Sequence, residues 1–192
     1  MTKIAVLISG RGSNMEAIIS AINNGKLGAE VCFVGSDSEN AKGLQTARDL
    51  GLKTLIFSYG EKNSLKDEAE KDLLNALHEN GAEWLILAGF MRVLSKNFVE
   101  RMEGRIVNIH PSLLPSFKGA HAIADALAYG VKVTGVTVHL ADEFVDSGRI
   151  LAQRAVEIKE GDTLDTLAER IHEVEHSLYP ETLEKLFIKE CR

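Results

Sequence analysis

Three polar side chains in the second half of the sequence have the types that addition to a carbonyl group requires. Asn108 and His110 stand two residues apart at the end of an apolar run, and Asp146 opens an Asp-Ser-Gly turn. An amide can donate to a developing oxyanion, an imidazole can donate a proton or a positive charge, and a carboxylate can orient that imidazole. Each residue alone is ordinary for a strand end or a turn, whereas the three together favour a catalytic site.

The surrounding sequence narrows the chemistry. His139 on a later apolar run and Asp142 in the loop after it add polar groups to the same region. The chain has no Gly-x-Ser-x-Gly sequence, the pattern that holds a nucleophilic serine between a strand and a helix. Its absence favours direct transfer between two substrates over an acyl-enzyme.

A glycine-rich loop near the N-terminus is a candidate anion site. It reads Ser9-Gly10-Arg11-Gly12-Ser13-Asn14 and leads from an apolar run into a helical pattern. Glycines let the backbone approach a ligand, and the N–H groups of a helix N-terminus attract anions. The loop lacks the Lys-Ser/Thr ending of a P-loop, and Met15 stands where a dinucleotide fingerprint needs a small residue. A phosphate cradle and a plain turn both remain open, and we interpret Asp37, after the next apolar run, as a turn residue.

A second motif, His172-Glu173-Val174-Glu175-His176, matches the zinc-binding sequence H-E-x-x-H. Apolar residues at helical spacing from Leu164 to Leu178 place both histidines beside an apolar stripe, and no third histidine follows. We therefore reject a zinc site and expect no metal. The same spacing places Glu175 inside the stripe, where a buried carboxylate needs polar partners.

The elements that must position these residues alternate along the chain. Apolar runs predict strands at 4–8, 30–35, 53–57, 84–88, 105–109, 132–140 and 150–158. Helical spacing predicts helices at 14–24, 40–50, 63–80 and 95–102, and a long one at 163–189 that is broken or bent near Pro180. This alternation is typical of an α/β fold, with a mostly parallel twisted sheet and helices on both faces. We expect a single domain over 1–192, with ligands at the carboxyl ends of the strands.

The composition of the 192 residues excludes several classes of protein. A formal net charge of −6 argues against nucleic acid as a partner. No apolar run is long enough to span a membrane, and the N-terminus lacks the features of a signal peptide. Cys32 and Cys191 form no Cys-x-x-Cys pair. We expect a cytoplasmic protein that acts on small molecules.

Several motifs together resemble a known family. The run Asn108-Ile109-His110-Pro111-Ser112-Leu113-Leu114-Pro115 is similar to the signature of the formyltetrahydrofolate-dependent transferases. The opening loop, Ala88-Gly89-Phe90-Met91-Arg92 and Asp146-Ser147-Gly148 fit one branch of that family, in order, from residue 3 to about 181. The resemblance implies a Rossmann-like formyltransferase fold. It also implies transfer of a formyl group from 10-formyltetrahydrofolate, as cosubstrate, to the primary amine of glycinamide ribonucleotide in de novo purine biosynthesis.

The resemblance also implies roles for individual residues. The catalytic residues would be Asn108, His110 and Asp146. The phosphorylated ribonucleotide would bind to Gly12, Ser13, Asn14, Glu175 and His172, with Glu175 on the ribose hydroxyls. The folate would bind to Lys66, Met91, Arg92, Val93, Leu94, Asn108, Asp142, Glu143 and Asp146, with Lys66 near its glutamate carboxylates. No metal, nucleic acid or membrane is implied, and the chain would be a monomer or a homodimer.

Two positions depart from the family pattern. His172 stands where the family has Lys or Gln, and it is either a phosphate ligand when protonated or a plain surface residue. Arg149 stands where Pro is common after the Asp-x-Gly turn. The alternatives to the transferase are a formyltetrahydrofolate hydrolase, formylation of another amine, a nucleotide-binding module without catalysis and a zinc hydrolase.

Overall fold

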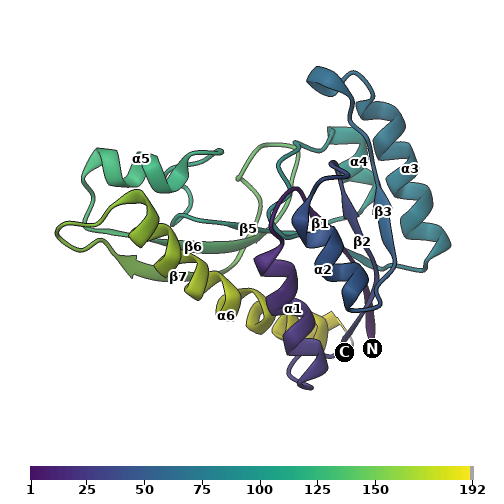
Figure 1. The fold of residues 1–192 in the computed structure, drawn as a ribbon, viewed down its shortest axis with the longest axis horizontal. Helices are drawn as coiled ribbons and strands as arrows, with labels where there is room; N and C mark the ends of the chain where they lie inside the picture. The colour runs from purple at the N-terminus through teal and green to yellow at the C-terminus, as the bar shows by residue number, and fades with distance from the viewer. Residues whose placement is uncertain (191–192) are drawn as a thin grey trace.

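The computed structural model describes residues 1–190 and has an α/β fold built on one seven-stranded sheet (Figure 1). Its strands are β1 (Thr2–Ile8), β2 (Ala29–Ser36), β3 (Thr54–Ile56), β4 (Trp84–Leu87), β5 (Ile106–His110), β6 (Val133–Leu140) and β7 (Ile150–Glu157). Its helices are α1 (Ser13–Asn23), α2 (Lys42–Asp49), the 3₁₀ turn η1 (Glu61–Asn63), α3 (Lys66–Glu79), α4 (Lys96–Arg101), α5 (Ala122–Tyr129) and α6 (Leu164–Glu190).

The sheet order is β3-β2-β1-β4-β5-β6-β7. The first five strands are parallel to one another, and β6 and β7 each run antiparallel to the strand before them. The predicted, mostly parallel sheet is therefore confirmed. The antiparallel pair β5–β6 matters for the site, because it sets residues of β6 directly opposite the end of β5.

Helices cover both faces of the sheet because the central strands are apolar on both sides. In β1, Ile4, Val6 and Ile8 pack on one face, and Ala5 and Leu7 pack on the other. Helices α1, α2 and α6 share the first core, and α3 and α4 share the second. This two-sided burial explains why the strands read as continuous apolar runs in the sequence.

Two predicted elements differ in the structure. Helix α5 is not predicted by the sequence analysis, because its eight residues are mostly small and only Ala122 and Ala126 are buried, which leaves little helical periodicity to detect. Helix α6 is not broken at Pro180 but continues through it. The proline removes one backbone N–H, while the buried side chains of Leu183, Leu186 and Phe187 hold the following turns against the core.

Helix α6 also contacts the backbone of two central strands. The Tyr179 hydroxyl lies 3.0 Å from the carbonyl oxygen of Leu87 at the end of β4 and 2.9 Å from that of Val107 near the start of β5. The side chain is fully buried, so this hydroxyl is the donor available to these two carbonyls.

None of the helices within residues 1–190 combines the length and the apolar composition needed to cross a membrane. Of the two cysteines, Cys32 is a free thiol in β2, and Cys191 lies outside the described residues.

Candidate active site

The three predicted catalytic residues come together at the end of β5. Asn108 and His110 lie on β5, and Asp146 lies in the loop that joins β6 to β7. The antiparallel register places His139 of β6 directly opposite Asn108. His110 and His139 are buried, at 5% and 2% exposure, and the Asp146 side chain is 8% exposed. One amide, two imidazoles and one carboxylate thus form a largely desolvated cluster.

His110 is held between two hydrogen-bond acceptors. Its Nδ1 lies 3.3 Å from Oδ2 of Asp146, and its Nε2 donates to the carbonyl oxygen of Phe117 at 2.8 Å. The doubly protonated imidazolium satisfies both contacts, since it carries an N–H on each nitrogen. Asp146 is fixed in turn because its Oδ2 also accepts from the backbone N–H of Gly119 at 2.9 Å.

His139 has the opposite character. Burial lowers its pKa from the ordinary value of 6.5, against the raising effects of the Leu140 carbonyl and Asp146. The ring is therefore neutral near pH 7, and its Nδ1 donates to the carbonyl oxygen of Leu140 at 2.9 Å. Its Nε2 keeps a lone pair, 3.2 Å from Nδ2 of Asn108, and accepts one N–H of that amide. The second N–H of Asn108 remains for a ligand.

His139 is predicted from the sequence to lie in the same region, but its contact with Asn108 is not predicted. That contact follows from the antiparallel pairing of β5 with β6, which sets the two residues opposite one another. Apolar periodicity does not reveal strand direction, so this pairing becomes visible only in the fold.

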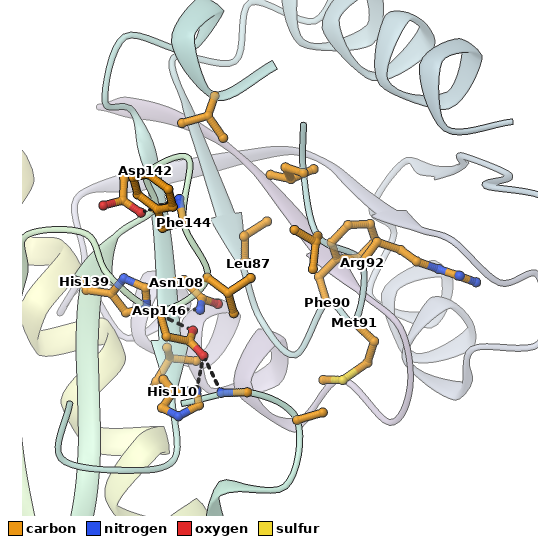
Figure 2. Close-up of a pocket in the computed structure, with 18 of the residues that line it drawn as sticks. Leu87, Phe90, Met91, Arg92, Asn108, His110, His139, Asp142, Phe144 and Asp146 are labelled. Atoms are coloured by element: carbon orange, nitrogen blue, oxygen red, sulfur yellow. Dashed lines mark hydrogen bonds and ion pairs between the residues drawn. The ribbon is translucent and has the colours of Figure 1, made fainter. Parts of the chain in front are cut away.

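A cavity of about 250 Å³ opens beside this cluster. Residues 89–94, after β4, form one wall, and residues 141–146, after β6, form the other. Figure 2 shows Asp146 between the rings of His110 and His139, with Arg92 extending away from them. Eight of the nine residues predicted to bind folate line the cavity: Met91, Arg92, Val93, Leu94, Asn108, Asp142, Glu143 and Asp146.

Lys66 is the ninth and is not part of this lining. Its Nζ lies 3.9 Å from Oε1 of Glu70, one turn further along α3. Glu70 is buried and also accepts from the backbone N–H of Ser95 at 2.8 Å. The ammonium of Lys66 is thus partly engaged with a carboxylate of its own helix.

Asp37, which is interpreted from the sequence as a turn residue, forms an ion pair with Arg92. Its Oδ2 accepts from Nε of Arg92 at 2.6 Å, and Asn63 accepts from another guanidinium nitrogen of Arg92 at 3.0 Å. The guanidinium also lies 5.7 Å from the centre of the Tyr59 ring. These partners come from distant parts of the chain, so sequence spacing alone does not pair them.

The opening loop passes directly into α1. Gly12 has φ of +83°, and a Cβ there would lie 3.0 Å from the Cα of Gly43, so both the backbone angle and the close approach require glycine. Ser13 and Asn14 begin the helix. Ser9 joins this loop to the cavity wall: its N–H donates to the Gly89 carbonyl at 3.1 Å, and its hydroxyl accepts from the Met91 N–H at 2.8 Å.

Helix α6 brings Glu175 against the start of α1. Glu175 is 5% exposed, which confirms the predicted inward side chain, and its Oε2 accepts from Nδ2 of Asn14 at 3.0 Å. Burial raises the pKa of Glu175, and the Asn14 hydrogen bond and a charge on His172 act against that rise. Oδ1 of Asn14 is buried without a protein partner, an acceptor that a ligand hydroxyl could satisfy.

The two histidines of the H-E-x-x-H motif lie beside each other, with ring centres 6.4 Å apart and planes 19° apart. Over residues 1–190 no set of three or more His, Cys, Asp or Glu side chains is placed to hold a metal ion. Burial lowers the pKa of His176, while Glu16 and Glu173 raise it.

The chain is similar to known proteins over nearly its whole length. A family model described as Formyl transferase matches residues 2–183. Phosphoribosylglycinamide formyltransferase of Bacillus subtilis is 39% identical over 188 residues, which cover 97% of this chain and 95% of that protein. The trifunctional purine biosynthetic protein adenosine-3 of Gallus gallus is 46% identical over 182 residues, but this chain spans only 18% of its length.

Solved structures agree with the sequence comparison. The crystal structure of phosphoribosylglycinamide formyltransferase from Bacillus Halodurans superposes with a TM-score of 0.93 at 43% identity, and the match covers 98% of this chain and 97% of that one. Glycinamide ribonucleotide transformylase 1 from Geobacillus kaustophilus gives a TM-score of 0.92 at 42% identity, covering 97% and 98%.

Proposed function

This chain belongs to the formyl transferase family, and on that premise we propose that it transfers a formyl group from 10-formyltetrahydrofolate to the primary amine of glycinamide ribonucleotide. The observation that carries the proposal is the meeting of Asn108, His110 and Asp146 at one edge of the cavity between residues 89–94 and 141–146. The reaction is a step of purine biosynthesis, and the residues 1–192 act as one formyltransferase domain.

The cavity suits an amphipathic donor such as a folate. Its walls carry exposed apolar side chains, with Met91 68%, Val93 57% and Phe144 65% exposed. Clustered exposed apolar groups at a hollow are typical of a ligand-binding surface. Asn108, His110 and Asp146 at its inner end supply the polar contacts that would fix the reacting group.

The proposed reaction is a direct attack through a tetrahedral intermediate. The amine nitrogen bonds to the formyl carbon, the carbonyl electron pair moves to oxygen, and the amine loses a proton. The bond from that carbon to N10 of the folate then breaks, and N10 takes up a proton. Transfer therefore needs one group that stabilises the oxyanion and one that moves protons.

The side chains are disposed for these two tasks. The free N–H of Asn108 would donate to the oxyanion, and protonated His110 would stabilise it through its positive charge, because its two ring nitrogens already face Asp146 and the Phe117 carbonyl. Asp146 holds the His110 ring by its Nδ1 and would accept the amine proton through water. His139 keeps the Asn108 amide oriented, since it accepts the other N–H. The buried setting strengthens each of these contacts.

The nucleotide is proposed to bind along the opening loop. Gly12, Ser13 and Asn14 present backbone N–H groups at the start of α1 to the phosphate, and Glu175 would receive the ribose hydroxyls. His172 is proposed to assist the phosphate when protonated. The hydrogen bonds that Ser9 donates to Gly89 and accepts from Met91 support this arrangement, because they join the nucleotide loop to the wall of the donor cavity.

The test mixes the protein with glycinamide ribonucleotide and 10-formyltetrahydrofolate and follows the release of deformylated folate. We expect turnover only when the nucleotide is present. Equal turnover without the nucleotide would identify a hydrolase instead, and turnover with other primary amines but not with this one would assign another acceptor. No turnover in any mixture would overturn the proposal.

A further inference from the structure

A second cavity, of about 370 Å³, lies between the start of β7 and the last turns of α6, apart from the proposed active site. Its apolar floor includes Leu151 and Leu186. Its rim carries three cationic side chains, Arg149, Lys185 and Lys189. None of its lining residues belongs to the donor cavity or to the opening loop.

The three cations have no acidic partner among the side chains of residues 1–189. No carboxylate oxygen of those side chains lies within 4.0 Å of a side-chain nitrogen of any of the three. The nearby acids of α6 are engaged elsewhere: Glu181 pairs with Arg154 at 2.9 Å, and Glu184 accepts from the backbone N–H of Gly28 at 2.7 Å. Positive charge thus gathers here in a chain whose formal net charge is −6.

Two of the three charges repel each other along α6. Lys185 and Lys189 are four residues apart on one helix, where like charges repel. Arg149 faces the same cavity from a backbone that is fixed, because its carbonyl accepts from the Leu140 N–H at 2.9 Å. Next to it, a Cβ on Gly148 would lie 1.8 Å from the Leu140 carbonyl oxygen, so only glycine fits at that position.

We propose that this cavity is an anion-binding site for a phosphoryl-bearing ligand, held by Arg149, Lys185 and Lys189. A guanidinium matches two phosphoryl oxygens with paired N–H groups, and lysine ammoniums add point charges. A single carboxylate would balance only one of the three charges, whereas a pyrophosphate group carries enough negative charge for all of them. The ligand class is therefore a di- or polyphosphorylated small molecule.

Titration calorimetry with inorganic pyrophosphate tests the site directly. The double variant Arg149→Gln/Lys185→Gln removes two charges from exposed side chains and keeps the opening loop, so any phosphate binding at that loop is common to both proteins. Loss of two charge-assisted contacts should weaken pyrophosphate binding at the cavity by at least about tenfold. Lys189→Gln alone should weaken it in the same direction.

The matched control is Lys26→Gln/Lys159→Gln, which removes equal charge from exposed positions outside both cavities. We expect the control to bind pyrophosphate as the unaltered protein does. Pyrophosphate should also raise the thermal midpoint of the unaltered protein and of the control by more than it raises that of the double variant. An equal loss in the control, an unchanged affinity in the double variant, or no binding to the unaltered protein would each overturn the proposal.

Discussion

Asp146 is the side chain on which the proposed chemistry depends most. Its Oδ2 accepts a hydrogen bond from the Gly119 N–H and lies 3.3 Å from Nδ1 of His110. Its Oδ1 lies 3.7 Å from Nε2 of His139. The sequence predicts that Asp146 and His110 act together. It does not predict Gly119 or Phe117 as partners, because these are backbone groups whose position depends on the path of a loop and not on residue type.

Replacing His110 or Asp146 tests this unit. We expect His110→Ala and Asp146→Asn each to lower kcat for formyl transfer at least about 10²-fold, the usual scale for general acid–base groups. Steady-state rates with both substrates saturating measure the effect. His78→Ala, an exposed histidine on α3, is the matched control and should leave kcat unchanged. Rates near that of the unaltered protein would move the chemistry to other residues.

His139 predicts a dependence of stability on pH. Its pKa is lower in the folded protein than the 6.5 of an exposed histidine, so the unfolded chain binds the proton more readily. The free energy of unfolding should therefore fall as pH drops below about 6.5, by at most about 1.4 kcal/mol per pH unit for one such group. Urea unfolding between pH 7.5 and about 5.5 measures the slope.

The variant His139→Gln isolates this contribution. Glutamine can still accept the Asn108 N–H through its carbonyl oxygen but does not titrate. We expect a shallower slope below about pH 6.5 than in the unaltered protein, with the remainder coming from groups such as His176, whose pKa is also lowered by burial. An identical slope would show that His139 does not titrate differently on folding.

At the scale of elements, apolar periodicity predicts every strand and most helices, because two-sided burial leaves long apolar runs. It misses α5, in which only Ala122 and Ala126 are buried. The break or bend predicted near Pro180 is not a break, because the buried side chains that follow offset the local cost of the proline and the helix continues. Strand direction is the larger gap. The reversal at β6 brings His139 to Asn108, and no local pattern encodes it.

Tyr179 shows how one element supports another. Its hydroxyl is the donor close to two carbonyls, that of Leu87 at the end of β4 and that of Val107 near the start of β5. We expect Tyr179→Phe to lower the free energy of unfolding by about 1–3 kcal/mol, because a buried acceptor loses its donor. Tyr129→Phe, at an 80% exposed position, should change it by less than about 0.5 kcal/mol. Equal changes in the two variants would contradict this role.

At the scale of the whole molecule, the first and last helices, α1 and α6, pack against each other although they are far apart in the sequence. Asn14 and Glu175 are 161 residues apart, and their hydrogen bond links α1 to α6 (Figure 1). Helical spacing predicts that Glu175 points inward, because that depends on its own helix alone. Its partner could not be predicted, since it depends on how two distant helices pack.

The buried carboxylate of Glu175 should cost the fold stability. Its pKa is raised, so its charged form is less favourable in the folded protein than in the unfolded chain at pH 7. We expect Glu175→Gln to raise the free energy of unfolding at pH 7 while raising KM for glycinamide ribonucleotide and leaving KM for the folate nearly unchanged. Glu173→Gln, an exposed neighbour, is the control. A less stable Glu175→Gln protein would contradict the expectation.

Ser9 has a consequence for how the two substrates influence each other. Ser9 donates its backbone N–H to Gly89 and accepts the N–H of Met91 with its hydroxyl, so it contacts both neighbours of Phe90. The backbone that follows Ser9 forms the turn before α1. In the proposed binding mode, a nucleotide that draws this turn toward its phosphate would also shift residues 89–91 in the wall of the proposed folate cavity. We expect occupancy of either compartment to change the affinity of the other by one common factor, as thermodynamic reciprocity requires. Ser9→Ala removes the hydroxyl contact with Met91 but keeps the backbone hydrogen bond to Gly89. With Kd measured for each substrate in the presence and absence of the other, this variant should move that factor toward one.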